Sequence, residues 1–138
     1  MSPSRNNRDA AIYCRTAVAD NSIVEQREAC QAFAAPHGYS VPEGYVCLDD
    51  GCSGMTLERP GLQRLRGLIR TRVVQAVIVL DLARLSRTLT HLFLLADECT
   101  QAEVAVHVVQ LPSMSMCEAF GVLRHEAEAD GGERGVTR

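Results

Sequence analysis

The sequence contains no lysine and no tryptophan, and all 14 of its basic residues are arginine. No apolar run approaches the roughly 18 residues that a membrane-spanning helix needs, so we expect no membrane partner. The N-terminal segment 1–9 is polar and lacks the apolar stretch of a signal peptide, which argues against secretion. The six cysteines form no C-x-x-C pair, and their spacing relative to the four histidines matches no zinc site. These absences favour a soluble, cytoplasmic protein with reduced thiols and no zinc site.

What the chain does contain is ordinary globular composition with an uneven charge. Its 138 residues are 46% hydrophobic and 22% charged, which fits one domain and excludes a disordered chain. The net charge is −3, yet residues 59–87 hold seven arginines against one aspartate. One basic block in an acidic chain argues against a general nucleic-acid coat and favours a local anion site. Four of these arginines, at 64, 66, 70 and 72, are interpreted mainly as solvated helix surface.

Strand and helix patterns alternate along the chain. Apolar, partly β-branched runs predict strands over 10–16, 45–48, 73–80 and 104–109. Helical periodicity and end signals predict helices from Ser22 to His37, from Pro60 onward, and over about 90–101, with a loop over 49–59. This order predicts an α/β fold with a mainly parallel sheet of four or more strands and helices on both faces. Segment 1–9 is expected to be disordered, 10–110 to form the domain, and 111–138 to add a short helix over 117–129 and an acidic tail.

Arginines gather where the predicted strands end. Arg15 lies at the end of the first strand, and Arg84 and Arg87 follow the third. Ligands of parallel α/β sheets bind at the carboxyl ends of the strands, so three guanidinium groups there suit one phosphate. Structural ion pairs with the acids at 49, 50 and 81 explain the same spacing equally well. The spacing alone leaves both interpretations open.

Four short motifs surround these positions. They are Tyr13-Cys-Arg15-Thr-Ala17, Gln26 nine residues after position 17, Asp50-Gly-Cys-Ser53-Gly54 with Arg59-Pro-Gly61-Leu62, and Ala83-Arg84-Leu85-Ser86-Arg87. In this order they resemble the Y-x-R-x-S motif, the Gln, the D-x-x-S-G loop with R-x-G-L, and the D-R-L-[SG]-R motif of the catalytic domain of serine recombinases of the resolvase/invertase family. The sequence is most similar to the large serine recombinases, and the resemblance covers residues 10 to 110.

The resemblance implies a resolvase-like fold and site-specific DNA strand exchange, in which a serine attacks a phosphodiester and forms a 5′-phosphoseryl link. Family members act as dimers and tetramers on DNA and use no metal or nucleotide cofactor. Arginines stabilise the charge that develops on phosphorus. Carried over to this chain, the phosphate clamp is Arg15, Arg84 and Arg87. Supporting or DNA-contacting roles fall to Gln26, Asp50, Ser53 and Arg59.

The chain departs from the family at the nucleophile. The serine position holds Ala17, whose methyl group cannot attack phosphorus, so we expect an inactive chain. Thr16 is adjacent, but strand alternation points it to the other side of the sheet from Arg15 and position 17. Ser22 is interpreted as a helix cap.

Two further departures concern the motif acid and the C-terminus. Ala83 replaces the acid that opens the D-R-L-[SG]-R motif, and we expect Asp81, two residues earlier, to compensate in part for its loss. The predicted 117–129 helix is short beside the family's long dimerisation helix, so we expect either a fragment of a longer protein or a truncated relative, with weakened assembly.

Two main functions therefore remain open. One is a recombinase domain whose nucleophile has been lost, and the other is an inactive resolvase-like protein that binds DNA or recombinase partners and regulates them. A third hypothesis, a thiol protein using Cys14 or Cys52, has little support because most partly buried cysteines are inert.

Overall fold

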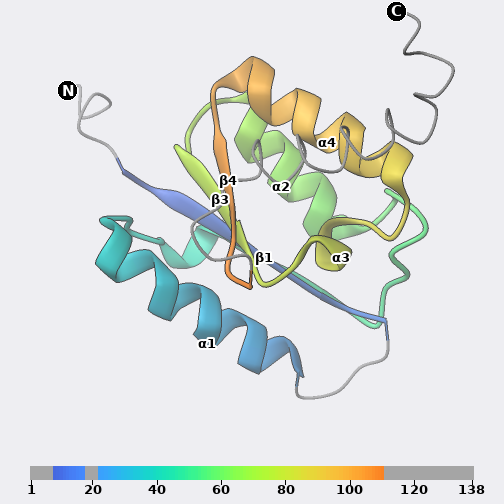
Figure 1. Cartoon of the computed structure of the whole chain (residues 1–138), viewed down its shortest axis with the longest axis horizontal. Coiled ribbons are helices and arrows are strands. Elements are labelled where there is room, and N and C mark those ends of the chain that lie inside the picture. The colour runs from blue at the N-terminus through green and yellow to red at the C-terminus, as the bar shows by residue number, and fades with distance from the viewer. Residues whose placement is uncertain (1–7, 18–21, 111–138) are drawn as a thin grey trace, which may run out of the picture.

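The computed structural model describes residues 8–17 and 22–110 of the chain (Figure 1). In this part the chain forms a four-stranded, all-parallel sheet with the strand order β2-β1-β3-β4. The strands are β1 (Ala10–Thr16), β2 (Val46–Asp50), β3 (Ala76–Val79) and β4 (Ala105–Val108). The α-helices are α1 (Ser22–Ala34), α2 (Pro60–Arg70), α3 (Leu82–Leu85) and α4 (Leu89–Ala102). The predicted fold class is confirmed.

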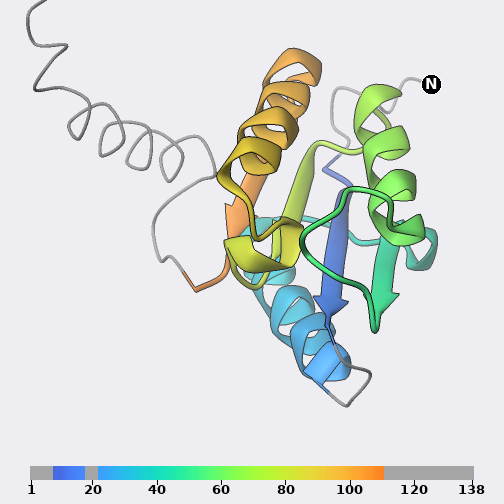
Figure 2. The ribbon, with the colours of Figure 1, turned by 90° about the vertical axis from the view of Figure 1, so that its right-hand side faces the viewer.

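Helices cover both faces of the sheet, as expected. Helix α1 lies on one face, and α2 and α4 lie on the other (Figures 1 and 2). Alternate residues of β1 explain the two layers: Ile12 and Cys14 belong to the core under α1, while Ala11 and Tyr13 belong to the core under α2 and α4. The two apolar clusters hold β1 in the middle of the molecule and carry its end to the site described below.

The boundaries of three strands differ from the predicted ones, and one of these, the fourth strand, covers 105–108 of the predicted 104–109. The second strand starts one residue later and extends to Asp50, because Arg15 pairs with Asp49 and Thr16 with Asp50 in the parallel ladder. The third strand covers only 76–79 of the predicted 73–80. Its first residues are still part of the turn after α2, since Arg72 has a φ of 58° and the Val73 N–H donates to the Leu68 carbonyl.

The helices also differ in detail. Helix α1 ends at Ala34, and residues 35–37 continue as one 3-10 turn that contains Pro36 and is closed by Gly38 at a φ of 82°. Glu43–Tyr45 forms a second 3-10 turn before β2. The short helix α3 was not predicted, because its four residues are too few to show a period. The predicted 117–129 helix and most of segment 1–9 lie outside the described residues.

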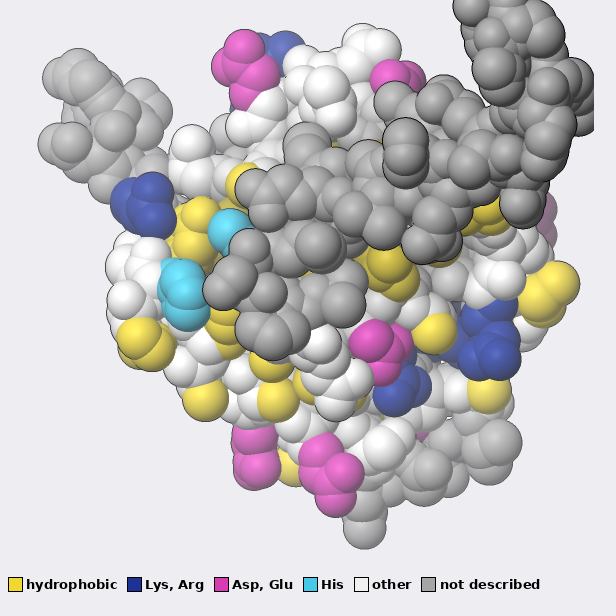
Figure 3. All heavy atoms as spheres, in the orientation of Figure 1, with side chains coloured by type: hydrophobic (Ala, Val, Ile, Leu, Met, Phe, Trp, Pro, Cys, Tyr) yellow, Lys and Arg dark blue, Asp and Glu magenta, His cyan; other side chains and the backbone are white. Residues whose placement is uncertain are grey.

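A group of rings fastens β4 to the turn that follows α1. The Tyr39 hydroxyl and the His107 Nε2 atom are 3.0 Å apart, and the Phe33 ring stacks on His37 with centroids 3.9 Å apart. Arg8 lies over the Tyr39 ring and donates to the His37 and Gly38 carbonyls. Imidazole side chains stand among hydrophobic ones on this face (Figure 3). This group is at the opposite strand edge from β2.

No helix in the described ranges is both long enough and apolar enough to cross a lipid bilayer.

Candidate anion-binding site

The backbone at the end of β1 is held by Gln26 from α1. The Arg15 N–H donates to the Gln26 side-chain oxygen (3.0 Å), and the Gln26 amide nitrogen donates to the Arg15 carbonyl (2.9 Å). Gln26 is only 1% exposed, so water does not compete for these bonds. This predicted site residue is a support for Arg15 rather than a helix-surface residue.

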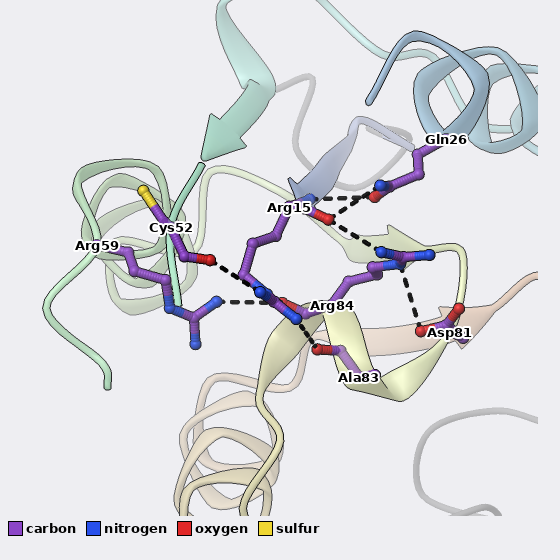
Figure 4. A network of polar contacts seen from close by, with 7 residues as sticks. All are labelled: Arg15, Gln26, Cys52, Arg59, Asp81, Ala83 and Arg84. Atoms are coloured by element: carbon purple, nitrogen blue, oxygen red, sulfur yellow. Dashed lines mark hydrogen bonds and ion pairs between the residues drawn. The ribbon is translucent and has the colours of Figure 1, made fainter. Parts of the chain in front are cut away.

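The Arg15 side chain is buried between two loops (Figure 4). Its Nε donates to the Arg84 carbonyl (3.1 Å), Nη1 to the Cys52 carbonyl (2.8 Å) and Nη2 to the Ala83 carbonyl (2.8 Å). Its partners are thus dipoles, and in the described ranges no carboxylate forms an ion pair with it. Arg15 therefore ties the loop after β2 to the loop after β3 and keeps its positive charge unneutralised.

Arg84 returns the contact that Arg15 makes. Its Nη1 donates to the Arg15 carbonyl (3.2 Å), while its own carbonyl accepts from Arg15, so each side chain bonds the other residue's backbone. The Arg84 guanidinium consequently lies on the Gln26 side of β1, away from the Arg15 guanidinium (Figure 4). Its Nε is 3.5 Å from the Asp81 Oδ1. Of the three acids considered as alternative partners, Asp81 is the one that pairs with Arg84.

Arg59 is a second buried arginine of the site. It donates to the carbonyls of Arg84 and Leu85 and, through Nη1, to the Tyr13 hydroxyl (2.9 Å). It is 1% exposed, so its role is support and not direct contact with a ligand at the surface.

Tyr13 and Asp49, to which the sequence assigned no role in the site, continue this network. The Tyr13 hydroxyl donates to Asp49 (2.6 Å), which also accepts the Gly61 and Leu62 N–H groups at the start of α2. Burial, followed by the bond to Asp49, raises the Tyr13 pKa above its ordinary value, so the phenol keeps its proton. Strand alternation, which places Tyr13 on the Arg15 face, was the sequence signal that pointed to it.

Gly54 lies next to both Arg87 and Arg15. A Cβ atom at Gly54 would lie 2.6 Å from the Arg87 Cγ and 2.8 Å from the Arg15 Nη2, so only glycine leaves room for both side chains. The Arg87 N–H and the Ser86 hydroxyl donate to the Gly54 carbonyl. Arg87 itself is exposed, and its guanidinium has no hydrogen bond or ion pair with any residue the structure describes.

Arg15, Arg59, Arg84 and Arg87 form what we call the arginine cluster. The other predicted site residues lie at the surface around it. Asp50 accepts a hydrogen bond from the Thr16 hydroxyl (2.8 Å), and the Ser53 hydroxyl accepts the Met55 N–H (3.0 Å), which shapes the turn. Ala17 is exposed directly after β1. Thr16 is buried with its hydroxyl on Asp50, so its oxygen is already engaged on the side of the sheet that alternation predicted.

The charge of the cluster is dominated by its arginines. Burial, followed by the nearby charges of Arg59, Arg84 and Arg87, lowers the Arg15 pKa. Four guanidinium groups in one region make it favourable for an anion. Arg87 is the exposed one among them, so an oxyanion can reach it from solvent.

The arginines on and after α2 have other work. Arg66 forms two hydrogen bonds with Glu98 on α4 and is mostly buried, which corrects its interpretation as solvated surface. Arg70 pairs with the same carboxylate at 3.5 Å, Arg64 donates to the Gly44 carbonyl, and Arg72 donates to the Gln101 carbonyl. A groove of about 450 Å³ beside α2 and α4 is lined by several of these groups, and Arg70 and Glu98 in its lining pair with each other.

Cysteine and metal chemistry find little support. Burial raises the pKa of the Cys14 and Cys30 thiols to about 12 and that of Cys47 to about 11, so these thiols stay protonated and unreactive. Cys52 is partly exposed and lies near Asp49 and the Asp50 carbonyl. Within the described ranges, no three His, Cys, Asp or Glu side chains are placed to hold a metal ion.

A comparison with models of known protein families identifies the family of this chain. The family model described as the N-terminal domain of resolvase matches residues 10–123. The chain belongs to the resolvase family. This confirms the resemblance seen in the motifs. No match was found among curated proteins.

Solved structures extend the comparison of this resolvase-family domain. The N-terminal catalytic domain of TP901-1 integrase is 28% identical, with a TM-score of 0.76 over 95% of this chain and 100% of that one. The C-terminal catalytic domain of ISC1926 TnpA, an IS607-like serine recombinase, is 25% identical, with a TM-score of 0.68 over 91% of this chain and 84% of that one.

A third structure supports the fold alone. A resolvase family site-specific recombinase from Streptococcus pneumoniae shares 18% identity, with a TM-score of 0.71 over 95% of this chain and 93% of that one. Together with the family match, these structures identify the fold as that of a serine recombinase catalytic domain.

Proposed function

We propose that this resolvase-family domain binds a phosphate group of DNA at its arginine cluster and, with Ala17 at the nucleophile position, does not cleave the strand. The printed descriptions of the similar structures, an integrase and serine recombinases, support DNA as the partner. Assembly into a dimer or tetramer on DNA, as in the family, is part of the proposal.

The exposed guanidinium of Arg87 is the observation that carries the proposal. The Arg87 Cγ and the Arg15 Nη2 lie 2.6 Å and 2.8 Å from the position that a Gly54 Cβ would take. The Arg15 charge has no carboxylate partner in the described ranges, and the Arg87 guanidinium makes no bond of its own there. A phosphate oxygen would give Arg87 a charge-assisted hydrogen bond and would reduce the mutual repulsion of the cluster. The Arg84 guanidinium is bonded to the Arg15 carbonyl and lies apart from the Arg15 guanidinium, so it would contact the phosphate from its own side of β1. The buried Arg59 and Gln26 act as supports.

Position 17 sets the limit of the chemistry. In the serine mechanism that the family resemblance implies, the side-chain oxygen forms a bond to phosphorus while the bond to the 3′ oxygen breaks and that oxygen takes a proton. Ala17 has no oxygen to form this bond. Thr16 offers one, but its hydroxyl is buried and donates to Asp50. The domain therefore binds the phosphodiester and leaves it intact.

The test is DNA binding by matched arginine variants. The 138-residue chain is titrated into a fluorescent DNA duplex at low salt, and binding is measured as a rise in fluorescence anisotropy. We expect the unchanged chain to bind. We expect Arg87→Ala to weaken binding about tenfold, since one charge-assisted contact contributes about 1.5–3 kcal/mol. Arg70→Ala is the control: it also removes an exposed positive charge, but at the end of α2, where Arg70 pairs with Glu98. It should change the affinity for the duplex less than twofold. Equal losses in both variants, or no binding by the unchanged chain, would contradict the proposal.

A regulatory role is the second candidate, and Ala17 is the observation that favours it. A domain that occupies a recombination site without cutting would block an active recombinase at that site. In a strand-exchange assay with an active family member, this chain should inhibit and Arg87→Ala should inhibit less. Inhibition that is independent of Arg87 would point to contact with the enzyme and not with its DNA.

A further inference from the structure

Asp81 is the one carboxylate in direct ionic contact with the arginine cluster in the described part of the chain. Its Oδ1 is 3.5 Å from the Arg84 Nε, at the point where β3 ends and α3 begins. Asp49 touches the cluster only through the Tyr13 hydroxyl, and Asp50 is occupied by Thr16. The local counter-ion of the cluster is therefore supplied by a single side chain.

The contact between Asp81 and Arg84 is incomplete. Both contact atoms are buried, and neither has a hydrogen-bond partner among the residues described. A separation of 3.5 Å exceeds the usual 2.7–2.9 Å of a charge-assisted bond. Buried polar atoms without hydrogen bonds are costly, so a group that supplied a well-placed oxygen would replace Asp81 favourably.

The position of the Arg84 guanidinium shows what the pair does to the cluster. The Asp81 contact and the bond to the Arg15 carbonyl keep this guanidinium on the Gln26 side of β1, apart from the guanidinium of Arg15 (Figure 4). Only one Nη1 bond of 3.2 Å to a carbonyl would hold it there without the carboxylate. The charge of Arg84 is thus partly neutralised and directed within the chain.

We propose that Asp81 is an internal counter-ion that competes with a phosphate group for Arg84 and so restrains ligand binding by the cluster. The inference rests on the proposed function, because it concerns the same site. The ligand chemistry is a phosphate oxyanion, supplied either by DNA or by free inorganic phosphate. Binding exchanges the Asp81 contact for a hydrogen bond between Arg84 and a phosphate oxygen.

The test is a double-variant cycle in the full chain. D81N keeps the shape of the side chain and removes its charge, so we expect it to increase affinity for a DNA duplex about fivefold. D97N makes the same charge change on exposed Asp97 of α4, and it should increase affinity less than twofold. In an R84A background, the gain from D81N should fall to the level of D97N. A titration with inorganic phosphate, read as a rise in melting temperature, asks whether free phosphate is sufficient.

Each outcome of the cycle is decisive. A fivefold gain that disappears with R84A supports competition for Arg84. A gain that persists with R84A shows a field effect on the ligand and overturns the inference, as does a loss of affinity in D81N, which would make Asp81 a positioning residue. Binding by the unchanged chain with no gain in D81N refutes the counter-ion role alone. No binding of duplex or phosphate by any variant refutes the proposed function as well.

Discussion

Ala17 stands exposed one residue beyond the Thr16 hydroxyl that Asp50 holds, and two residues beyond the backbone that Gln26 and Arg84 fix. The bonds from Gln26 and Arg84 thus fix the backbone next to position 17, whose side chain has no nucleophilic atom. The surrounding bonds do not involve the Ala17 methyl group, so a larger polar side chain there should leave them unchanged.

Replacing Ala17 by serine should restore some covalent chemistry. We expect Ala17→Ser, joined to a family dimerisation helix and DNA-binding region, to form a protein–DNA adduct with that region's cognate site. The unmodified chain in the same fusion should form none, because it lacks a nucleophilic oxygen at this position. Denaturing electrophoresis detects the adduct, and peptide mass spectrometry locates it.

Two results would change this account of position 17. An adduct of the unmodified chain at Thr16 or Ser22 would show that the nucleophile has been assigned to the wrong residue. A folded, DNA-binding Ala17→Ser protein without an adduct would show that the site has changed beyond position 17, with Ala83 the next residue to restore.

The residues of the cluster were predictable from the sequence, but their partners were not. Arg15, Arg84 and Arg87 were found because they follow strands that turn out to be neighbours. Their guanidinium groups had two obvious kinds of partner, phosphate and carboxylate, and Arg15 uses backbone carbonyls instead. Loop carbonyl directions depend on φ and ψ angles that spacing does not encode, so that arrangement required the structure.

Glycines in two elements offer a matched test of packing. Gly54 lies in the loop over the cluster, where a Cβ would meet Arg87 and Arg15, whereas a Cβ at Gly67 of α2 has nothing within 4 Å. We expect Gly54→Ala to lower the free energy of unfolding by about 1–3 kcal/mol, because overpacking displaces buried groups. Gly67→Ala should raise it by about 0.5–1 kcal/mol, because glycine weakens a helix interior.

Urea denaturation of the two variants measures both effects. If both variants change the free energy of unfolding by the same small amount, the loop around Gly54 can shift away from Arg15 without cost. This result would contradict the role given to the hydrogen bonds that hold the loop. Gly54→Ala should also weaken duplex binding, whereas Gly67→Ala should leave it unchanged.

The start of α2 depends on the first of two adjacent acids at the end of β2. Asp49 is buried and accepts the Gly61 and Leu62 N–H groups and the Tyr13 hydroxyl. Exposed Asp50 accepts mainly from Thr16. We expect Asp49→Ala to cost about 3 kcal/mol of unfolding free energy and Asp50→Ala about 1 kcal/mol, since bonds to a buried carboxylate are stronger and leave unpaired donors when lost. Similar costs for the two variants would contradict this account.

The elements themselves were largely predictable, with errors at their ends. Apolar runs gave the four strands and helical spacing gave α1, α2 and α4. The turn after α2 was misassigned because Val73 and Val74 have strand propensity, and tertiary contacts overrode it: Val73 closes the helix end, and Val74 is buried in the core. Helix α3 depends on the local turn after Asp81, which is too short for any periodic signal.

The ring group at the β4 edge makes the stability of the whole domain depend on pH. Burial, followed by the charges of His37 and Arg8, lowers the His107 pKa below its ordinary value. The unfolded chain then binds more protons than the folded one near and below pH 6.5, so stability is full above that pH and falls as the pH decreases through the folded-state pKa.

Variants of this group separate burial from hydrogen bonding. Thermal melts between pH 7.5 and pH 5 should show a decreasing melting temperature that is less steep in His107→Gln. Tyr39→Phe removes the hydroxyl next to His107 but not the burial, so it should keep most of the pH dependence at a lower overall stability. A steeper decrease in His107→Gln than in the unchanged chain would contradict the assignment to His107.

The position of β1 has a consequence for how the protein is made. This strand is the first to be synthesised, yet it lies inside the sheet between β2 and β3. As the chain leaves the ribosome, β1 can pair on one side once residue 50 is available and on the other only when residue 79 is. Between these two points, translation produces a nascent chain with an open, apolar strand edge, which is the kind of edge that pairs with other chains. The speed of translation through residues 51–79 therefore sets how long each new molecule is exposed to aggregation.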